Sequence, residues 1–452
     1  MRLRTFTALL TILAAPVHAA VTVNPADGFD ELVRQGRAAF LASDLDGAES
    51  AYNQACPAEL VDTYPVAKAV TCENLLASVD EARGNLVRAE QQFLHAVAGA
   101  EQAGPAYQPL YCARLIDLGE HYHRQGRTAD AETSLLKAVG LARTLTAVKP
   151  ELLPEALIRL GALYSDSPQP ERGRAPLSEA LAGVAEGGVS GRPVPPVNEI
   201  AFAHNALGMI DLAAGRQREA ESNLRESVTL ATNALGEDHT VTAAYQANLA
   251  LTLLAEGQFG RAGLLLRRAL FVVESRQPPP AGELAVICAE ISAVASDEGK
   301  MARAEDYAQR AISILSVQQR PDPRTVSIAQ VALARIYVKS HDTASAEKIL
   351  PQAVEIQRQA AVYPGILAAS VQLLAELRAQ QRNWQAAEAL YREALGIYEK
   401  DGTGNVKPAA APLLLGLADV LRHEGGPKEE VRALESRARN ILRTASQSTP
   451  HV

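Results

Sequence analysis

The sequence predicts an all-α protein, a solenoid built from repeated helix pairs, and three observations support this. Alanine fills 82 of the 452 positions while aromatic residues make up only 4%, a composition that favours helices over strands. Two independent residue patterns recur along the chain with the same period, close to 42 residues. A glycine-containing turn divides most periods into two stretches with helical spacing of apolar residues.

The first recurring pattern is an alanine followed by an acidic residue. It occurs at Ala48, Ala89, Ala131, Ala220, Ala304, Ala346 and Ala387, with Ala262 as a variant that precedes a glycine. The second pattern is a Leu or Ile followed by a small residue, and we call it the marker. Markers fall at Leu76, Leu118, Leu160, Leu207, Leu249, Ile291, Leu333, Leu374 and Leu417. Their spacing is 41 to 43 residues, apart from one interval of 47, which indicates a repeat architecture of about ten units.

The repeat around residues 240–275 shows how one unit is organised. Apolar residues follow helical spacing up to Leu254, Gly257 interrupts them, and a second helical run begins near Ala262. This pattern predicts a helix, a tight turn and an antiparallel helix. Small residues such as Ala250 and Ala262 allow the two backbones to approach closely, and leucines fill the space around them.

These residues resemble the tetratricopeptide repeat. The match is clearest in the third repeat, at Leu118, Gly119, Tyr122, Ala131, Leu135 and Ala138. The period and the segment 235–239 are similar to the longer variety found in kinesin light chain. The resemblance covers residues 28–445 and implies a right-handed superhelical solenoid with an inner groove lined by the first helix of each repeat.

The repeats divide the chain into predicted segments. Residues 28–185 hold repeats one to four, and residues 197–445 hold repeats five to ten with a capping helix. The Gly/Pro-rich stretch 186–196 accounts for the long interval between markers, and we expect it to be non-helical and to act as a hinge or boundary. Residues 446–452 are expected to form a disordered tail.

The N-terminal residues 1–19 have the features of a signal peptide. Arg2 and Arg4 precede an apolar run of ten residues, and a small-x-small site follows, most simply cut after Ala19. We therefore expect a periplasmic or secreted protein, although an N-terminal helix or strand of the fold is the alternative. Removal of both arginines would change the net charge from -8 to -10.

Composition and motifs exclude several classes of function. An acidic chain without a basic run is not expected to bind nucleic acid. Beyond the leader, no apolar stretch is long enough to span a membrane. No metal-binding cluster, nucleotide-binding loop or catalytic motif with a supporting context is found, so we expect no cofactor, no metal and no enzymatic activity.

The resemblance implies which residues face the groove, mainly those two and five positions before and after each marker. The candidate groove contacts are Asn74, Glu81, Glu120, His123, Phe202, Asn205, Met209, Asn248, Leu251, Arg335, Gln372 and Glu376. Repeats two and three present polar and acidic residues, whereas repeats five to eight present a nearly apolar floor, with Phe202 and Met209 as anchors. The alternative is that these apolar residues belong to the core.

The repeat frame also places Cys56 at the end of one repeat and Cys72 at the start of the next, so a disulfide between them is implied; buried reduced thiols are the alternative.

The sequence as a whole indicates a non-catalytic scaffold that binds a partner protein or peptide in its groove. A glycan-binding scaffold for envelope polysaccharide and a self-associating, homo-oligomeric solenoid are the two alternatives.

Overall fold

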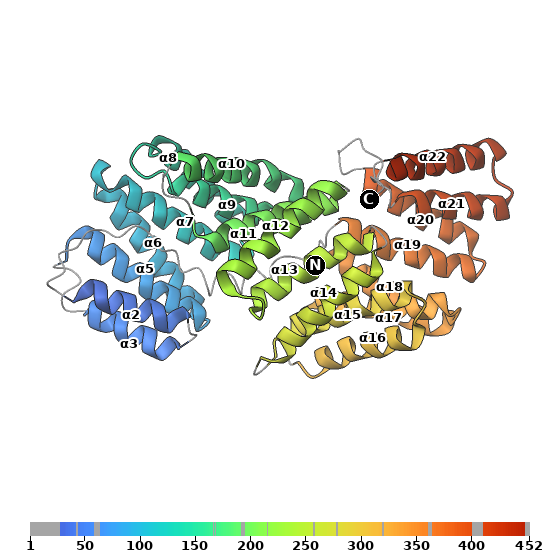
Figure 1. Ribbon diagram of the computed structural model, residues 1–452, viewed down its shortest axis with the longest axis horizontal. Helices are drawn as coiled ribbons and strands as arrows, with labels where there is room; N and C mark the ends of the chain where they lie inside the picture. Colours follow the sequence, from blue (N-terminus) through green and yellow to red (C-terminus); the bar gives the residue numbers. More distant parts are fainter. Residues whose placement is uncertain are drawn as a thin grey trace. The chain divides into compact units, whose positions relative to one another are not determined.

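A computed structural model describes residues 28–41, 44–57, 64–165, 167, 169–190, 195–214, 216–255, 258–276, 279–318, 321–359, 364–399 and 410–447. These residues form twenty α-helices, two short 3-10 helices and no strand, which confirms the all-α prediction (Figure 1). The predicted leader 1–19, with its cleavage site after Ala19, lies outside the described residues.

The helices follow one another as ten pairs, one pair for each predicted repeat. The first five pairs are α2 (Phe29–Leu41) and α3 (Leu45–Ala55), α5 (Val66–Ala82) and α6 (Leu86–Gln102), α7 (Gln108–Gln125) and α8 (Thr128–Thr144), α9 (Leu152–Ser165) and α10 (Arg174–Ser190), and α11 (Val197–Ala213) and α12 (Gln217–Leu235). The remaining five are α13 (Thr240–Ala255) and α14 (Phe259–Glu274), α15 (Ala281–Asp297) and α16 (Met301–Ser316), α17 (Pro323–Lys339) and α18 (Thr343–Gln359), α19 (Pro364–Gln380) and α20 (Trp384–Glu399), and α21 (Ala410–Glu424) and α22 (Lys428–Gln447).

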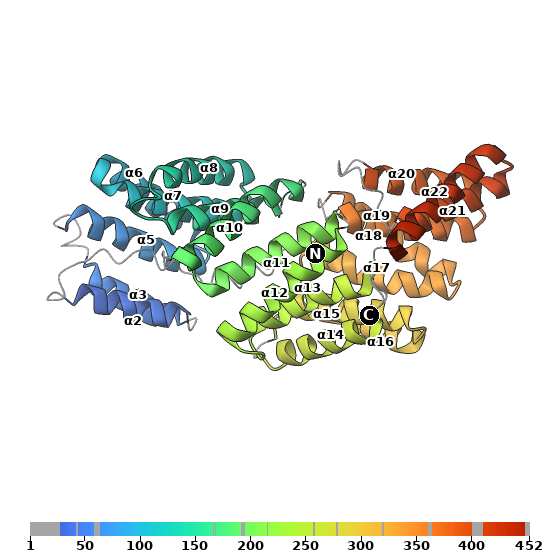
Figure 2. The ribbon, with the colours of Figure 1, turned by 45° about the horizontal axis from the view of Figure 1, so that its top comes forward.

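Close packing inside each pair follows from the small residues of the two recurring patterns. The alanines of the first pattern, from Ala48 to Ala387, have no exposed surface. Where the residue after the marker is glycine, the second helix leaves no room for a side chain. A Cβ atom built on Gly119 would lie 2.6 Å from Leu135 Cγ, and one on Gly161 would lie 2.4 Å from Leu177 Cγ. Within a pair, such as α7 and α8 or α15 and α16, the two helices lie side by side in both ribbon views (Figures 1 and 2).

The turn between the two helices of a pair uses a left-handed residue. Gly84, Gly126 and Gly299 have φ angles of 83°, 79° and 77°, a region that glycine enters without steric cost. His341 and Arg382 occupy the equivalent turn in later repeats, with φ angles of 60° and 59°. These two repeats therefore keep the turn geometry without its preferred residue.

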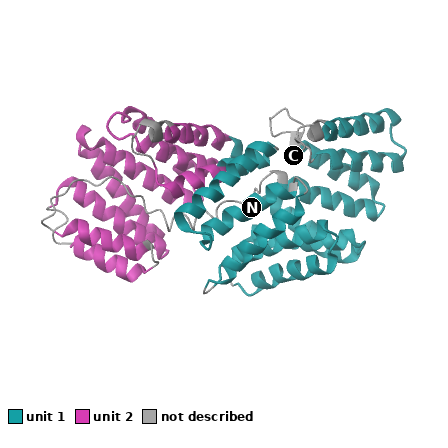
Figure 3. Ribbon diagram, in the orientation of Figure 1, with its two compact units in different colours: residues 1–2, 168–171, 207–452 teal, residues 3–167, 172–206 magenta. Residues whose placement is uncertain are grey.

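The contacts between helices divide the chain into two compact units, shown in different colours in Figure 3. The N-terminal unit contains the described residues up to 167 together with 172–206, and the C-terminal unit contains 169–171 and 207–447. The division falls inside α11, after Ala206, and so beyond the predicted hinge at 186–196.

Two sequence predictions about segment ends were wrong. The stretch 186–196 was expected to be non-helical, yet α10 continues to Ser190. A glycine costs a helix only about 1 kcal/mol, so Gly187 and Gly188 can continue a helix that begins at Arg174, and residues 191–194 of the stretch lie outside the described part. Residues 446 and 447 of the predicted tail belong to α22, and residues 448–452 lie outside the described part.

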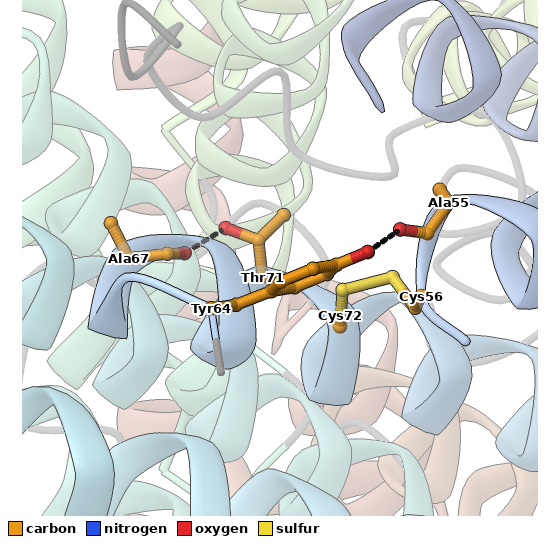
Figure 4. Close-up of a disulfide and its surroundings, with 6 residues drawn as sticks. All are labelled: Ala55, Cys56, Tyr64, Ala67, Thr71 and Cys72. Atoms are coloured by element: carbon orange, nitrogen blue, oxygen red, sulfur yellow. Dashed lines mark hydrogen bonds between the residues drawn. A yellow bond between two sulfur atoms is a disulfide. The ribbon is translucent and has the colours of Figure 1, made fainter. Parts of the chain in front are cut away.

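A disulfide joins the first two repeats. Cys56, at the end of α3, is bonded to Cys72 of α5, the pair that the repeat frame implied, with a Cα–Cα distance of 5.7 Å (Figure 4). Tyr64 crosses the same junction and donates a hydrogen bond from Oη to the carbonyl oxygen of Ala55, at 3.1 Å. The other two cysteines, Cys112 and Cys288, are buried and free.

Candidate functional site

All of the predicted groove contacts lie on first helices, but most of them are not exposed. Asn74, Glu120, His123, Phe202, Asn205, Met209 and Asn248 are buried, and Glu81, Leu251, Arg335, Gln372 and Glu376 are half-buried. Phe202 is 2% exposed and Met209 is 7% exposed. The expected exposed apolar floor with these two side chains as anchors is therefore wrong for this structure.

For the residues on α7, α13, α17 and α19, one reason is that first helices contact one another directly. In the C-terminal unit α13 touches α15, α15 touches α17 and α17 touches α19, and in the N-terminal unit α7 touches α9. Small residues at many first-helix positions allow this approach, which covers the side chains that face along the stack. The half-buried residues, such as Leu251 and Arg335, are the ones left accessible on this first-helix face.

In the N-terminal unit, charged side chains of four successive first helices form a ladder. Glu81 of α5 accepts a hydrogen bond from Arg124 Nε of α7 at 2.9 Å. Arg124 also lies 3.5 Å from Glu120, and Glu120 lies 3.5 Å from Arg159 of α9. Arg159 in turn donates to Glu199 of α11 at 2.9 Å. Carboxylates and guanidinium groups therefore alternate from one helix to the next.

The ladder is largely removed from solvent, so its charges depend on one another. Burial alone would raise the pKa of Glu81, but Arg124 and His121 lower it below its usual value. Burial would lower the pKa of Arg159, but the carboxylates of Glu120 and Glu199 raise it. Because each buried charge is offset by a neighbour, the ladder fixes these four helices relative to one another and leaves little free charge for a ligand.

Two buried carboxyl groups beside the ladder have raised pKa values, which favours their neutral, protonated form. Burial raises the pKa of Asp117 to about 6, although Arg114 lies 3.0 Å away and opposes the shift. Burial, together with the charge of Glu199, raises the pKa of Glu155 well above its usual value. Both groups lie on the helices that carry the ladder, α7 and α9.

Sequence reasoning identified Glu81 and Glu120 but missed their partners Arg124, Arg159 and Glu199. A signal was present in the repeat frame, because the residue directly before each marker is ionisable in only three repeats. These residues are Asp117, Arg159 and Glu290. Two of them belong to the charged cluster of the N-terminal unit, and the third lies on α15 of the C-terminal unit.

Glu290 differs from the other two in having no charged partner among the described residues. It is 8% exposed, its Oε2 has no hydrogen-bond partner, and no described Arg, Lys or His forms an ion pair with it. Burial raises the pKa of Glu290 to about 8. Ser296, further along the same helix, is 2% exposed and its Oγ also lacks a hydrogen-bond partner.

Among the described residues, no group of three or more His, Cys, Asp or Glu side chains is arranged to hold a metal ion. Within the same part of the chain, none of the helices has the length and apolar character needed to cross a bilayer. The site features of this structure are therefore two first-helix faces, a charge-paired one in the N-terminal unit and a largely apolar one in the C-terminal unit, where α15 carries two buried carboxyls, Glu283 and Glu290.

Comparison with protein families agrees with this architecture. Models described as tetratricopeptide repeat match residues 199–274 and 370–404. With the ten helix pairs, these matches show that the chain contains tetratricopeptide repeats. A search of curated protein sequences finds no significant match.

Several solved structures are similar in fold. A Rap protein complexed with Competence and Sporulation Factor is 14% identical, with a TM-score of 0.57 over 83% of this chain and 99% of that one. The apo form of RapI is 12% identical, with a TM-score of 0.58 over 84% of this chain and 100% of that one. BtubC (BKLC) from P. vanneervenii is 21% identical and covers 53% of this chain and 94% of its own, with a TM-score of 0.44.

Proposed function

We propose that this chain is a non-catalytic scaffold that binds a partner protein or peptide along the first-helix face of its C-terminal unit. The observation that carries the proposal is the continuity of the repeat. All twenty described α-helices belong to repeat pairs, and in the part of the chain that the structure describes only two short 3-10 helices are added to them, so no inserted element is seen that could carry a catalytic site. Proteins built only from stacked repeats act through the surfaces that the stack creates.

Two further observations support a binding role and its place. The ladder of the N-terminal unit offsets its own charges, whereas the C-terminal first-helix face keeps accessible side chains at Leu251, Arg335 and Gln372. The Rap protein with a similar fold was solved in complex with Competence and Sporulation Factor. The segment 1–19 supports export to the periplasm as part of the same proposal.

Affinity capture from a periplasmic extract, followed by titration with the purified captured partner, tests the proposal. The wild-type chain without residues 1–19 is compared with Leu251→Glu, which places a charge on the half-buried first-helix face. The matched control is Phe271→Glu, because Phe271 is 63% exposed on the second helix α14.

We expect Leu251→Glu to weaken binding of the purified partner at least tenfold while Phe271→Glu leaves it unchanged. A partner lost only with Phe271→Glu would move the site to the second helices. Failure of the wild-type chain to retain any partner would contradict the scaffold proposal, and a concentration-dependent oligomer in the same samples would favour the self-association alternative instead.

A further inference from the structure

The C-terminal unit pairs most of its half-buried arginines with an acid. Five half-buried arginines are described in this unit, and three of them form ion pairs: Arg216, Arg268 and Arg378. The other two, Arg324 and Arg335, form no ion pair and no side-chain hydrogen bond with any described residue. Both lie on α17, so this first helix holds two partly desolvated guanidinium groups without an anion.

The two arginines share one face of α17. They are eleven residues apart, which is three helical turns plus about 20°, and at 1.5 Å per residue this separates them by about 16 Å along the axis. Ile328 lies between them on the same face and is also half-buried. No side-chain nitrogen of either arginine is both buried and unpartnered, so these unpartnered nitrogens are open to solvent.

The acids closest to this face in the repeat frame are bonded to other groups. Asp322 caps α17, and its Oδ1 accepts a hydrogen bond from the backbone N–H of Arg324 at 3.3 Å. Glu376 of α19, which takes the place of Arg335 in the next repeat, accepts a hydrogen bond from Gln372 at 2.8 Å. Neither carboxylate forms an ion pair with a described arginine of α17.

The carboxyl groups of the preceding first helix do not supply the anion either. This helix, α15, contacts α17 and carries Glu283 and Glu290. Both are buried, and neither forms an ion pair with a described residue. Burial raises the pKa of Glu283 to about 7 and that of Glu290 to about 8, which favours their neutral form.

We propose that Arg324 and Arg335 bind two carboxylates of the partner, carried by a segment whose intervening side chains are apolar. This inference rests on the proposed function, and it names the chemistry of the partner. The planar guanidinium group matches a carboxylate with two parallel hydrogen bonds, and apolar side chains between the two acids can pack against Ile328. An extended segment rises about 3.3 Å per residue, so acids four to six residues apart span about 13 to 20 Å.

The test uses two pools of short peptides built from Ala, Leu and Val. Each peptide of the first pool has two glutamates four to six residues apart, and each peptide of the second has glutamine at both positions. All ends are acetylated and amidated so that the glutamates are the only charged groups. The pools are incubated with the chain without residues 1–19, and the peptides retained through size exclusion are quantified by mass spectrometry.

Four proteins are compared: the wild type, Arg324→Gln, Arg335→Gln and Arg267→Gln. Because Arg324 and Arg335 have no partner in the fold, their replacement breaks no ion pair, and circular dichroism verifies that both variants are folded. Arg267 is exposed on the second helix α14 and also has no acidic partner among the described residues. Arg267→Gln is the matched control, because all three variants lose one positive charge.

We expect the wild type and Arg267→Gln to retain the glutamate pool about tenfold more than the glutamine pool. Each of the two α17 variants should reduce this ratio to about three, because one of two charge-assisted contacts remains. The preference of the wild type should also weaken with added salt.

A ratio of one in the wild type would overturn the proposal, and so would an equal fall in all three variants, which would indicate attraction by overall charge. Retention of neither pool would also overturn it. The proposed function is judged separately, by the titration of the captured partner against Leu251→Glu, so a failure of the two arginines leaves that result standing.

Discussion

Replacement of Gly119 by alanine tests the packing that defines the repeat. Gly119 lies inside α7, and a Cβ atom there would be 2.6 Å from Leu135 Cγ and 2.9 Å from Leu135 Cδ2. Leu135 is fully buried on α8, so it has no free space into which to move. The new methyl group must therefore push the two helices apart or force Leu135 away from its preferred rotamer.

The expected magnitude follows from two opposing effects. Alanine in place of a mid-helix glycine stabilises a helix by about 1 kcal/mol. Overpacking a dense core costs about 1 to 3 kcal/mol. Gly140 of α8 provides the matched control, because a Cβ atom there would meet nothing within 4 Å. Gly140→Ala should therefore raise the free energy of unfolding by about 1 kcal/mol, and Gly119→Ala should lower it by about 1 kcal/mol.

Urea unfolding followed by circular dichroism measures both variants against the wild type. If the free energy of unfolding depends on urea concentration with the same slope in all three proteins, the urea concentration at the unfolding midpoint should rise for Gly140→Ala and fall for Gly119→Ala. The difference between the two variants cancels the helix-propensity gain and gives the overpacking cost directly. If both variants stabilise the protein equally, α7 and α8 are not as closely packed as the structure shows, and the account of the small residues after each marker fails.

Three further perturbations act on other features. Arg159→Gln removes a buried cation between Glu120 and Glu199 and should lower the free energy of unfolding by about 3 to 5 kcal/mol, unlike an exposed Arg→Gln change elsewhere. Cys72→Ser opens a disulfide with a sequence separation of 16 and should cost about 3 kcal/mol under oxidising conditions, a difference that a reducing agent should abolish. Glu290→Gln should have the same free energy of unfolding as the wild type near pH 4 and an increasingly larger one between pH 4.5 and about 8. The reason is that the raised pKa of Glu290 makes the folded wild type hold a proton that the unfolded chain releases, so only the wild type loses stability as the pH rises through this range. A constant difference across that range would contradict the burial of this carboxyl.

The sequence was sufficient to predict the helices and their pairing because these depend on local pattern. The period of 42 residues, the alanines such as Ala131 and the turn glycines such as Gly126 all report contacts between a helix and its nearest neighbour in the chain. Those residues lie in the structure as predicted, with Ala131 fully buried and Gly126 in the left-handed region.

The pairing of charges could not be predicted in the same way. Arg159 and Glu199 are 40 residues apart, and whether they meet depends on the distance and rotation between successive first helices. The burial of Phe202 is likewise a property of the packed structure that the local sequence pattern did not predict. Local pattern also failed at Gly187 and Gly188, because a helix that has already formed can continue through glycine at a cost of only about 1 kcal/mol per residue.

Photo-crosslinking in the cell tests the central claim, that a partner binds the first-helix face of the C-terminal unit, most directly. A photoreactive phenylalanine analogue is placed at Leu251, which is half-buried on α13, or at Phe271, which is exposed on the second helix α14. The account predicts an adduct of one discrete mass from position 251 and none from position 271. Adducts from position 271 alone, or from neither position, would contradict it.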